Sequence, residues 1–260
     1  MKRLTFLLLA AVALAGCDAF SSEPTYGGLS IEGFNYTPYN LDRFVIKDKY
    51  GNTASGGGDL PPGTGEGRLS CCYKLKGTNF TVNWDVYDAD EAIKDIYAPI
   101  KMIHKVTNVH LAPTKVPGGA GDVVLGLHFY PDDHIEFEFR KDLSGTRIAY
   151  DEIWYWLKKN HNQLLNPDGQ DDDAMLRKAA RLAAAGWKKY GFTDTVDLEQ
   201  YVYLTLLNPR FDEHPAVRLA IKEANGKPGA FGMAMQRLPD SVVDDIKQGR
   251  FETSKSAQHG

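Results

Sequence analysis

Long apolar runs are scarce in this sequence of 260 residues. The one clear run, residues 4–14, is far shorter than the roughly 20 residues that a membrane-spanning helix needs. It follows the positive charges of Lys2 and Arg3. A short apolar run behind a positive start is typical of a secretory signal peptide. We therefore expect the chain to be exported, with residues 1–16 removed as the signal.

Cysteine is also scarce, since the chain has only Cys17, Cys71 and Cys72. Cys17 ends a Leu-Ala-Gly-Cys string that resembles the lipobox of bacterial lipoproteins, which implies acylation of its thiol. Several acyl chains would hold the protein stably on a bilayer. The alternative is an ordinary cleaved signal with an incidental cysteine. The expected localisation is periplasmic and lipid-anchored. Asp18 favours an anchor in the inner membrane, and the outer membrane is the alternative.

The adjacent pair Cys71-Cys72 has two interpretations. Cα atoms of neighbouring residues lie about 3.8 Å apart across a trans peptide, whereas ordinary disulfides want roughly 4.4–6.8 Å. The pair is therefore either two reduced, largely buried thiols or a strained vicinal disulfide formed in the oxidising periplasm. The two intervening residues of the Cys-x-x-Cys motif are missing, which disfavours redox catalysis.

Positive charge is in deficit. Loss of Lys2 and Arg3 with the signal lowers the net charge from −4 to −6. An acidic chain argues against nucleic acid and against an anionic lipid surface as partners. Residues 17–28 are polar and rich in Ser, Pro and Gly, so they predict a short tether between the lipid and the fold.

Two periodicities divide the rest of the chain. Residues 29–148 alternate apolar and polar side chains between turn signals, which predicts an antiparallel β-sandwich or a curved sheet. Residues 149–250 have helical spacing, and residues 251–260 predict a disordered tail. The expected class is thus α+β. The predicted strands are 29–37, 43–50, 70–75, 80–87, 101–111, 123–130 and 134–140. The predicted helices are 151–165, 173–190, 195–207, one from about Pro215 to Asn225 and one from about Pro239 to Gly249.

Motifs of known catalytic chemistry are missing. The chain has neither a Gly-x-Ser-x-Gly elbow nor a His-Glu-x-x-His helix. Four histidines fall in strand-like segments without a carboxylate or cysteine at a ligand spacing. The acidic stretch 166–173 lacks the glycine position and closing glutamate of a calcium loop, so it predicts a solvated helix start. We expect no metal, no cofactor and no enzymatic activity. The histidines are His104, His110, His128 and His134.

The segment 55–67 is rich in glycine but lacks the Gly-Lys-Ser/Thr ending of a phosphate-binding loop. It predicts a flexible surface connection. The alternative is an adaptable loop that binds a partner, because binding residues concentrate on loops carried by rigid sheets. In that case Asp59, Glu66 and Arg68 are the residues expected to contact the partner.

The segment 33–140 resembles a family of bacterial lipoproteins, the Tli-like immunity proteins of lipase effectors delivered by type VI secretion. The residues that carry the resemblance are Gly33-Phe34-Asn35-Tyr36-Thr37, Ser55-Gly56-Gly57-Gly58, Cys71-Cys72 and Thr81-Val82-Asn83-Trp84. More faintly, residues 211–215 and the helix before them resemble a helical module of other type VI-associated proteins.

The resemblance implies a protein that binds a cognate secreted lipase and occludes its active site or lid, without catalysis of its own. Two alternatives from other classes stay open at this point. One is a structural or assembly lipoprotein of the secretion system or envelope. The other is a periplasmic enzyme with an unfamiliar site.

Overall fold

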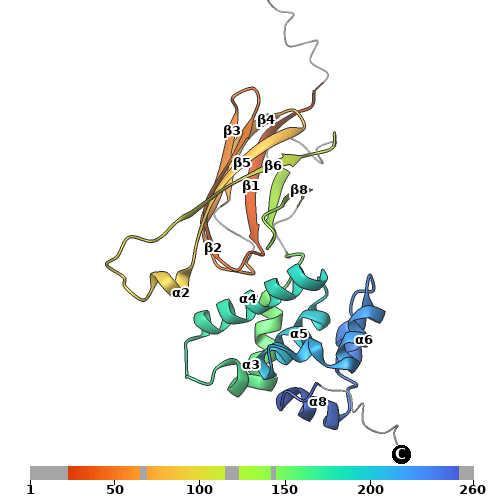
Figure 1. Cartoon of the computed structure of the whole chain (residues 1–260). Helices are drawn as coiled ribbons and strands as arrows, with labels where there is room; N and C mark the ends of the chain where they lie inside the picture. The colour runs from red at the N-terminus through yellow and green to blue at the C-terminus, as the bar shows by residue number, and fades with distance from the viewer. Residues whose placement is uncertain (1–22, 65–68, 115–122, 142–144, 252–260) are drawn as a thin grey trace, which may run out of the picture.

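The computed structural model describes residues 23–64, 69–114, 123–141 and 145–251. Strands fill the first half of the described chain and helices fill the second (Figure 1), so the predicted α+β class is confirmed. No helix within the described ranges is long and apolar enough to cross a membrane. Cys17, Glu66 and Arg68 lie outside these ranges.

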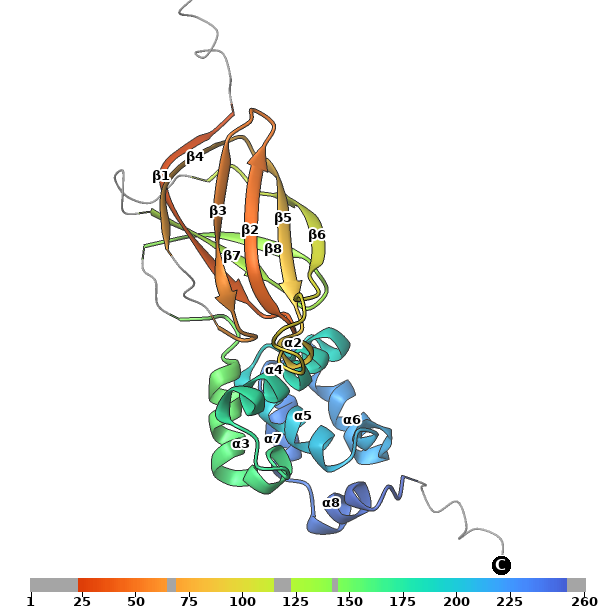
Figure 2. The same cartoon turned by 90° about the vertical axis from the view of Figure 1, so that its left-hand side faces the viewer.

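Eight strands form two facing sheets of four, in the orders β4-β1-β7-β8 and β3-β2-β5-β6 (Figure 2). Every pairing is antiparallel except that of β1 with β7, which is parallel. Large apolar side chains from both inner faces fill the space between the sheets. The strands are β1 (Thr25–Asn35), β2 (Asn40–Asp48), β3 (Thr53–Leu60), β4 (Ser70–Lys76), β5 (Asn79–Tyr87), β6 (Ile103–His110), β7 (Val123–Phe129) and β8 (Ile135–Arg140).

The expectation of a flexible connection at the start of the 55–67 segment is wrong, because Thr53–Leu60 forms strand β3. Gly56 of β3 and Gly33 of β1 make room for the ring of Phe44, which is fully buried, and Gly57 lies close to the backbone of Arg43. A Cβ on Gly56 would lie 2.5 Å from that ring, and one on Gly33 would lie 2.9 Å from it. The glycine-rich stretch is therefore a packing feature of the sandwich.

The helical half contains α3 (Tyr150–Leu165), α4 (Asp172–Tyr190), α5 (Thr195–Leu207), α6 (Pro215–Ala224), α7 (Ala230–Met235), α8 (Asp240–Lys247) and the 3₁₀ turn η1 (Phe211–Glu213). Asp171 caps α4 through the N–H of Ala174, as the expected solvated helix start requires. Small side chains let the helices approach closely: a Cβ on Gly186 of α4 would lie 2.6 Å from the ring of Tyr201 on α5.

Aromatic side chains join the two halves. Phe34, Tyr36 and Tyr130, from the ends of β1 and β7, belong to the buried core of the helical half. The Tyr150 hydroxyl donates a hydrogen bond of 3.2 Å to the Tyr36 carbonyl. Tyr130 stacks on Trp187 of α4 with ring centroids 5.3 Å apart. The strand half thus supplies three aromatic side chains to the core of the helical half, next to its own separate core.

Candidate binding surface

The connection between β5 and β6 forms a projecting arm, residues 88–102. It carries the short helix α2 (Ala89–Ala92) and then runs out away from the sandwich and the helical half (Figure 1). Four of the ten large apolar side chains that are exposed among the described residues lie on this arm. They are Ile93, Ile96, Tyr97 and Ile100, with exposed fractions of 60, 75, 92 and 49%.

Local hydrogen bonds give the arm a defined shape. The Asp88 side chain caps α2 by accepting from the N–H groups of Asp90 and Glu91. At the tip, the Asp95 carboxylate accepts from the N–H of Tyr97 at 3.0 Å. Side chains that accept from the backbone two residues ahead fix a turn in this way. The exposed apolar side chains therefore stand on ordered backbone.

Ion pairs brace the root of the arm against α4. Arg181 contacts Asp88 at 3.0 Å and Asp90 at 2.5 Å, and Arg177 contacts Asp90 at 2.7 Å. Arg181 also donates to the Pro38 carbonyl at 3.4 Å, which lies in the β1–β2 connection. Burial opposes ionisation of Asp90, but the hydrogen bond from Arg177 and the charge of Arg181 hold its pKa below its usual value. Contacts with α4 of the helical half and with the β1–β2 connection of the sandwich thus fix the direction in which the arm projects.

Asp59, one of the residues predicted to contact a partner, lies at the end of β3 and is exposed. Its carboxylate accepts hydrogen bonds from Tyr87 at 2.5 Å and from Asn40 at 2.9 Å. Burial and the neighbouring Asp59 carboxylate raise the pKa of Tyr87 to about 12. Because Tyr87 is the residue before the arm, Asp59 lies beside the arm's root.

A second polar cluster lies on the same sheet. Asp85 of β5 accepts from Arg43 at 2.6 Å and contacts His104 Nδ1 at 2.6 Å. Burial opposes ionisation of Asp85, but these two partners hold its pKa below the usual range. The Arg43 and His104 side chains are themselves largely exposed. The surface next to the arm therefore mixes both signs of charge.

The arm and the start of β1 lie at opposite ends of the sandwich. Thr25 of β1 pairs with Lys76 of β4, and the Asp48 carboxylate at the far end of β2 accepts from the N–H of Lys76. Tyr87, which precedes the arm, pairs instead with Asn40 at the other end of β2. At about 3.3 Å per residue, the nine residues of β2 separate these ends by roughly 30 Å.

Cys71 and Cys72 differ from the largely buried thiols that were one expectation. Both are exposed and unbonded, the peptide between them is cis, and their sulfurs lie 2.9 Å apart. Opposite them, β1 offers one residue, Ser30, between the paired positions Leu29 and Ile31. Two residues against one make a β-bulge in β4, so the regular alternation of side chains does not apply.

The four histidines do not share one sheet. His104 and His110 lie on β6, His128 lies on β7 in the other sheet, and His134 lies in the turn before β8. Within the described ranges, no group of three or more His, Cys, Asp or Glu side chains is arranged to hold a metal ion. Three of them each contact a carboxylate that the sequence did not point to: His104 contacts Asp85, His128 contacts Glu138 and His134 contacts Asp132.

His128 belongs to a chain of hydrogen bonds at the junction of the two halves. The backbone N–H of Arg147 donates to the Tyr36 hydroxyl at 2.9 Å, which leaves that hydroxyl to donate to His128 Nδ1 at 3.0 Å. The imidazole proton then lies on Nε2, 2.8 Å from Glu138. Burial, and secondarily the charge of Arg147, lower the pKa of His128 to about 4. Tyr36 and His128 are buried, whereas the Glu138 and Arg147 side chains at the ends of this chain of hydrogen bonds are 39 and 38% exposed. These contacts tie Arg147, just before α3, to β1 and β7.

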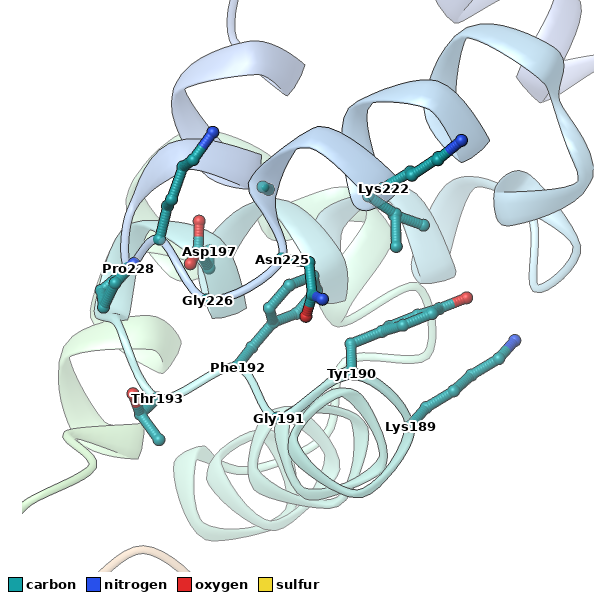
Figure 3. A pocket seen from close by; sticks show the side chains of 13 residues that line it. Lys189, Tyr190, Gly191, Phe192, Thr193, Asp197, Lys222, Asn225, Gly226 and Pro228 are labelled. Atoms are coloured by element: carbon teal, nitrogen blue, oxygen red, sulfur yellow. The ribbon is translucent and has the colours of Figure 1, made fainter.

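A cavity of about 410 Å³ lies in the helical half, between the end of α4 and the α6–α7 connection (Figure 3). Tyr190 and Phe192 form much of its wall, and the amino groups of Lys189 and Lys222 point outward. The Asp197 carboxylate reaches the cavity, but it accepts from two backbone N–H groups of the α7 region. Lys189 pairs with Asp212. Asp197 and Lys189 are thus engaged by contacts within the fold.

Comparison of the chain with protein-family models, with curated proteins and with solved structures finds no match.

Sequence reasoning did not identify the arm. Its signal was the length of the connection: fifteen residues join two neighbouring antiparallel strands, where two to five usually suffice. Long connections of this kind are commonly functional when they are ordered. The apolar residues of the arm were not distinguished from core residues, because sequence alone does not show that nothing covers them.

Proposed function

We propose that this chain is a membrane-anchored immunity protein that binds a secreted (phospho)lipase in the periplasm and neutralises it. The observation that carries the proposal is the arm, whose Ile96 and Tyr97 side chains project into solvent from a braced root. The resemblance of residues 33–140 to lipase-immunity lipoproteins supports it, as do the signal and lipobox at the N-terminus.

The arm suits a concave apolar site. A lipase must open such a site to admit acyl chains, and a convex apolar projection can fill it. Complete burial of an Ile or Tyr-sized side chain stabilises a complex by about 1.5–3 kcal/mol. A few such anchors at the centre of an interface commonly dominate its affinity. Occlusion of the cleft needs no chemistry from the arm.

The ordered shape of the arm favours tight binding. Each flexible side chain or loop that binding must immobilise costs about 0.5–1.5 kcal/mol. The α2 cap, the Asp95 turn and the ion pairs of Arg181 restrain the backbone before any partner arrives. Ordering the arm therefore offsets little of the free energy that burial of its apolar side chains contributes to binding.

The position of the arm fits an anchored protein. If Cys17 carries the lipid, the six residues to Glu23 span at most about 20 Å. The start of β1 then stays near the bilayer, and the arm lies roughly 30 Å from it along the sandwich. The apolar residues are thus kept at the end of the sandwich that is remote from the anchor.

Co-expression tests the proposal. Cells carrying a periplasmically targeted lipase encoded beside this chain should survive when they also produce the chain, and the two proteins should co-purify. The double variant Ile96→Ser/Tyr97→Ser should lose binding by about 100-fold or more, since removal of central anchors commonly costs more than 2 kcal/mol. The matched control is Tyr155→Ser on α3, because Tyr155 is 61% exposed but lies outside the arm.

Loss of protection and binding in the arm variant, with both retained in the Tyr155 variant, supports the proposal. Equal affinity of the arm variant and the parent would overturn the role of the arm. Failure of the parent chain to bind or protect would overturn the immunity function itself. Binding to an envelope component without protection would instead identify an assembly lipoprotein.

A further inference from the structure

Two exposed thiols on one β-bulge form a second unusual surface feature. β4 lies at the edge of its sheet, and the bulge places Cys71 and Cys72 opposite the single residue Ser30 of β1. Bulges are frequent at sheet edges, where they redirect side chains. Both cysteines are exposed residues, and their sulfurs lie 2.9 Å apart. A disulfide bond measures about 2.05 Å, so closure needs a shift of less than 1 Å.

The contacts around the bulge keep the pair at the surface. The next residue, Tyr73, pairs with Leu29 of β1, and its hydroxyl hydrogen-bonds to Ser55 of β3 at 3.0 Å. This contact ties the edges of the two sheets together on one side of the bulge. The hydrogen bond that the Cys72 thiol donates to the Cys71 sulfur raises the pKa of Cys72, and the charge of a neighbouring thiolate adds to this effect. Loss of a proton from one thiol therefore affects the other.

We propose that Cys71 and Cys72 form a thiol–disulfide exchange site whose resting state in the periplasm is a vicinal disulfide. The thiolate of one cysteine attacks a sulfur of an external disulfide, which forms a mixed disulfide and releases one thiol. The second cysteine gives up its proton and attacks the first sulfur, which forms the Cys71–Cys72 bond and releases the second thiol. The pair loses two electrons and two protons, and the external disulfide takes them up as two thiols.

Formation of the Cys71–Cys72 disulfide prevents disulfide links between neighbouring copies of the chain. An exposed thiolate in an oxidising compartment attacks any accessible disulfide and forms a mixed disulfide, which the thiol of another copy can then resolve into a link between chains. Lipid anchors would hold many copies in one membrane surface, where encounters between them are frequent. A thiol 2.9 Å away competes with every external thiol, so the bond forms within the chain. Formation of this bond does not depend on which lipase or other protein the chain binds.

The sequence provides a direct readout. Trypsin cleaves after Arg68 and Lys74, which releases the peptide 69–74 with both cysteines and without Cys17. The full-length chain is isolated from membranes and alkylated with iodoacetamide before reduction. The expected peptide is two hydrogens lighter than the dithiol and unlabelled, and it takes two labels after reduction. The same chain without its signal, retained in the reducing cytosol, should take two labels directly.

Oxidised glutathione tests the exchange step on purified protein that lacks the signal and Cys17. The reduced parent should lose both thiols and retain no glutathione. Cys71→Ser and Cys72→Ser should each keep one glutathione as a stable mixed disulfide, because the second thiol is gone. On non-reducing gels of membranes, each single variant should form several-fold more disulfide-linked dimer than the parent. The double variant Cys71→Ser/Cys72→Ser should form none.

Two results would overturn the proposal. One is a parent peptide from the membrane fraction that takes two labels without reduction. The other is a parent protein that keeps glutathione as the single variants do. A failure of export leaves the chain in the cytosolic fraction, where fractionation reveals it, and the glutathione experiment then decides on the exchange site alone.

Discussion

The sandwich and the helical half differ in where their small residues lie. In the sandwich, glycines on β1 and β3 make room for one large ring, that of Phe44, which also packs against Phe129 with centroids 5.1 Å apart. In the helical half, buried alanines along α4 let whole helices approach closely. Both cores contain large aromatic rings, but the sandwich leaves out side chains around Phe44, whereas α4 brings its small side chains against neighbouring helices. Loss of the Phe44 ring should therefore leave a space that its glycine neighbours do not fill.

Phe44→Ala should give the largest loss. The neighbouring Gly33 and Gly56 have no side chains that could move into the cavity, so the space stays empty. We expect the free energy of unfolding to fall by about 3–5 kcal/mol, as for other fully buried phenylalanines. Urea unfolding followed by tryptophan fluorescence measures it, with Tyr155→Ala as the exposed control. A loss of less than about 1 kcal/mol would show that the sandwich repacks as freely as a helical core.

Acid should weaken the junction through His128. Its folded-state pKa of about 4 lies below the unfolded value of 6.5, so the unfolded chain takes up a proton first as the pH falls. The unfolding free energy should therefore fall between pH 6.5 and 4, by up to about 3 kcal/mol, and stay level with respect to this group above pH 6.5. Chemical unfolding at several pH values measures the slope.

His128→Gln should flatten that slope. His161→Gln in the helical half should change it less, because burial lowers the pKa of the half-buried His161 without a buried network around it. Equal slopes in the parent and in His128→Gln would remove His128 as the cause.

Asp197→Ala should have a moderate effect within the helical half. The buried carboxylate accepts from the N–H of Gly229 at 2.8 Å and of Gly232 at 2.7 Å. Its removal leaves two buried donors without this partner, which should cost about 1–3 kcal/mol of unfolding free energy. Thermal unfolding by circular dichroism measures the loss. Asp197→Asn retains one acceptor oxygen, so its free energy of unfolding should fall less. Equal losses in the Asn and Ala variants would contradict this account.

Arg181→Ala should have the smallest global effect. Partly exposed ion pairs contribute about 0–1 kcal/mol, so the unfolding free energy should change little. The arm should nevertheless lose its brace, because Arg181 contacts both Asp88 and Asp90. Hydrogen exchange of the arm amides should become faster while exchange in β2 stays unchanged. Unaltered exchange in the arm would show that the remaining Arg177 contact suffices.

Most of the fold follows from local pattern, and the exceptions have a common cause. Seven of the strands and five of the helices fall close to the predicted ranges, because their alternation or helical spacing is regular. Strand β3 was missed because glycine disfavours strands locally, and its reason for being there is the distant ring of Phe44. The parallel pairing of β1 with β7 likewise joins residues that are far apart in the sequence, such as Leu29 and Val123, so local pattern does not predict it.

The candidate surface was less accessible to prediction than the fold. Asp59 was identified and lies beside the arm's root, but its carboxylate is engaged by Tyr87 and Asn40. The arm itself has the composition of a core segment, and only the three-dimensional arrangement shows its apolar side chains uncovered. Adjacent cysteines were noticed in the sequence, but their shared exposure depends on a bulge that pairing with β1 creates.

The junction bears on how such a chain can evolve. Phe34, Tyr36 and Tyr130 are encoded with the strands but complete the interior of the helices. A recombination event near residue 148 would follow the break in sequence pattern, yet it would leave the helical half without three of its core side chains. The two halves are therefore not interchangeable modules, and a relative that exchanged one of them would need compensating aromatic residues in the other.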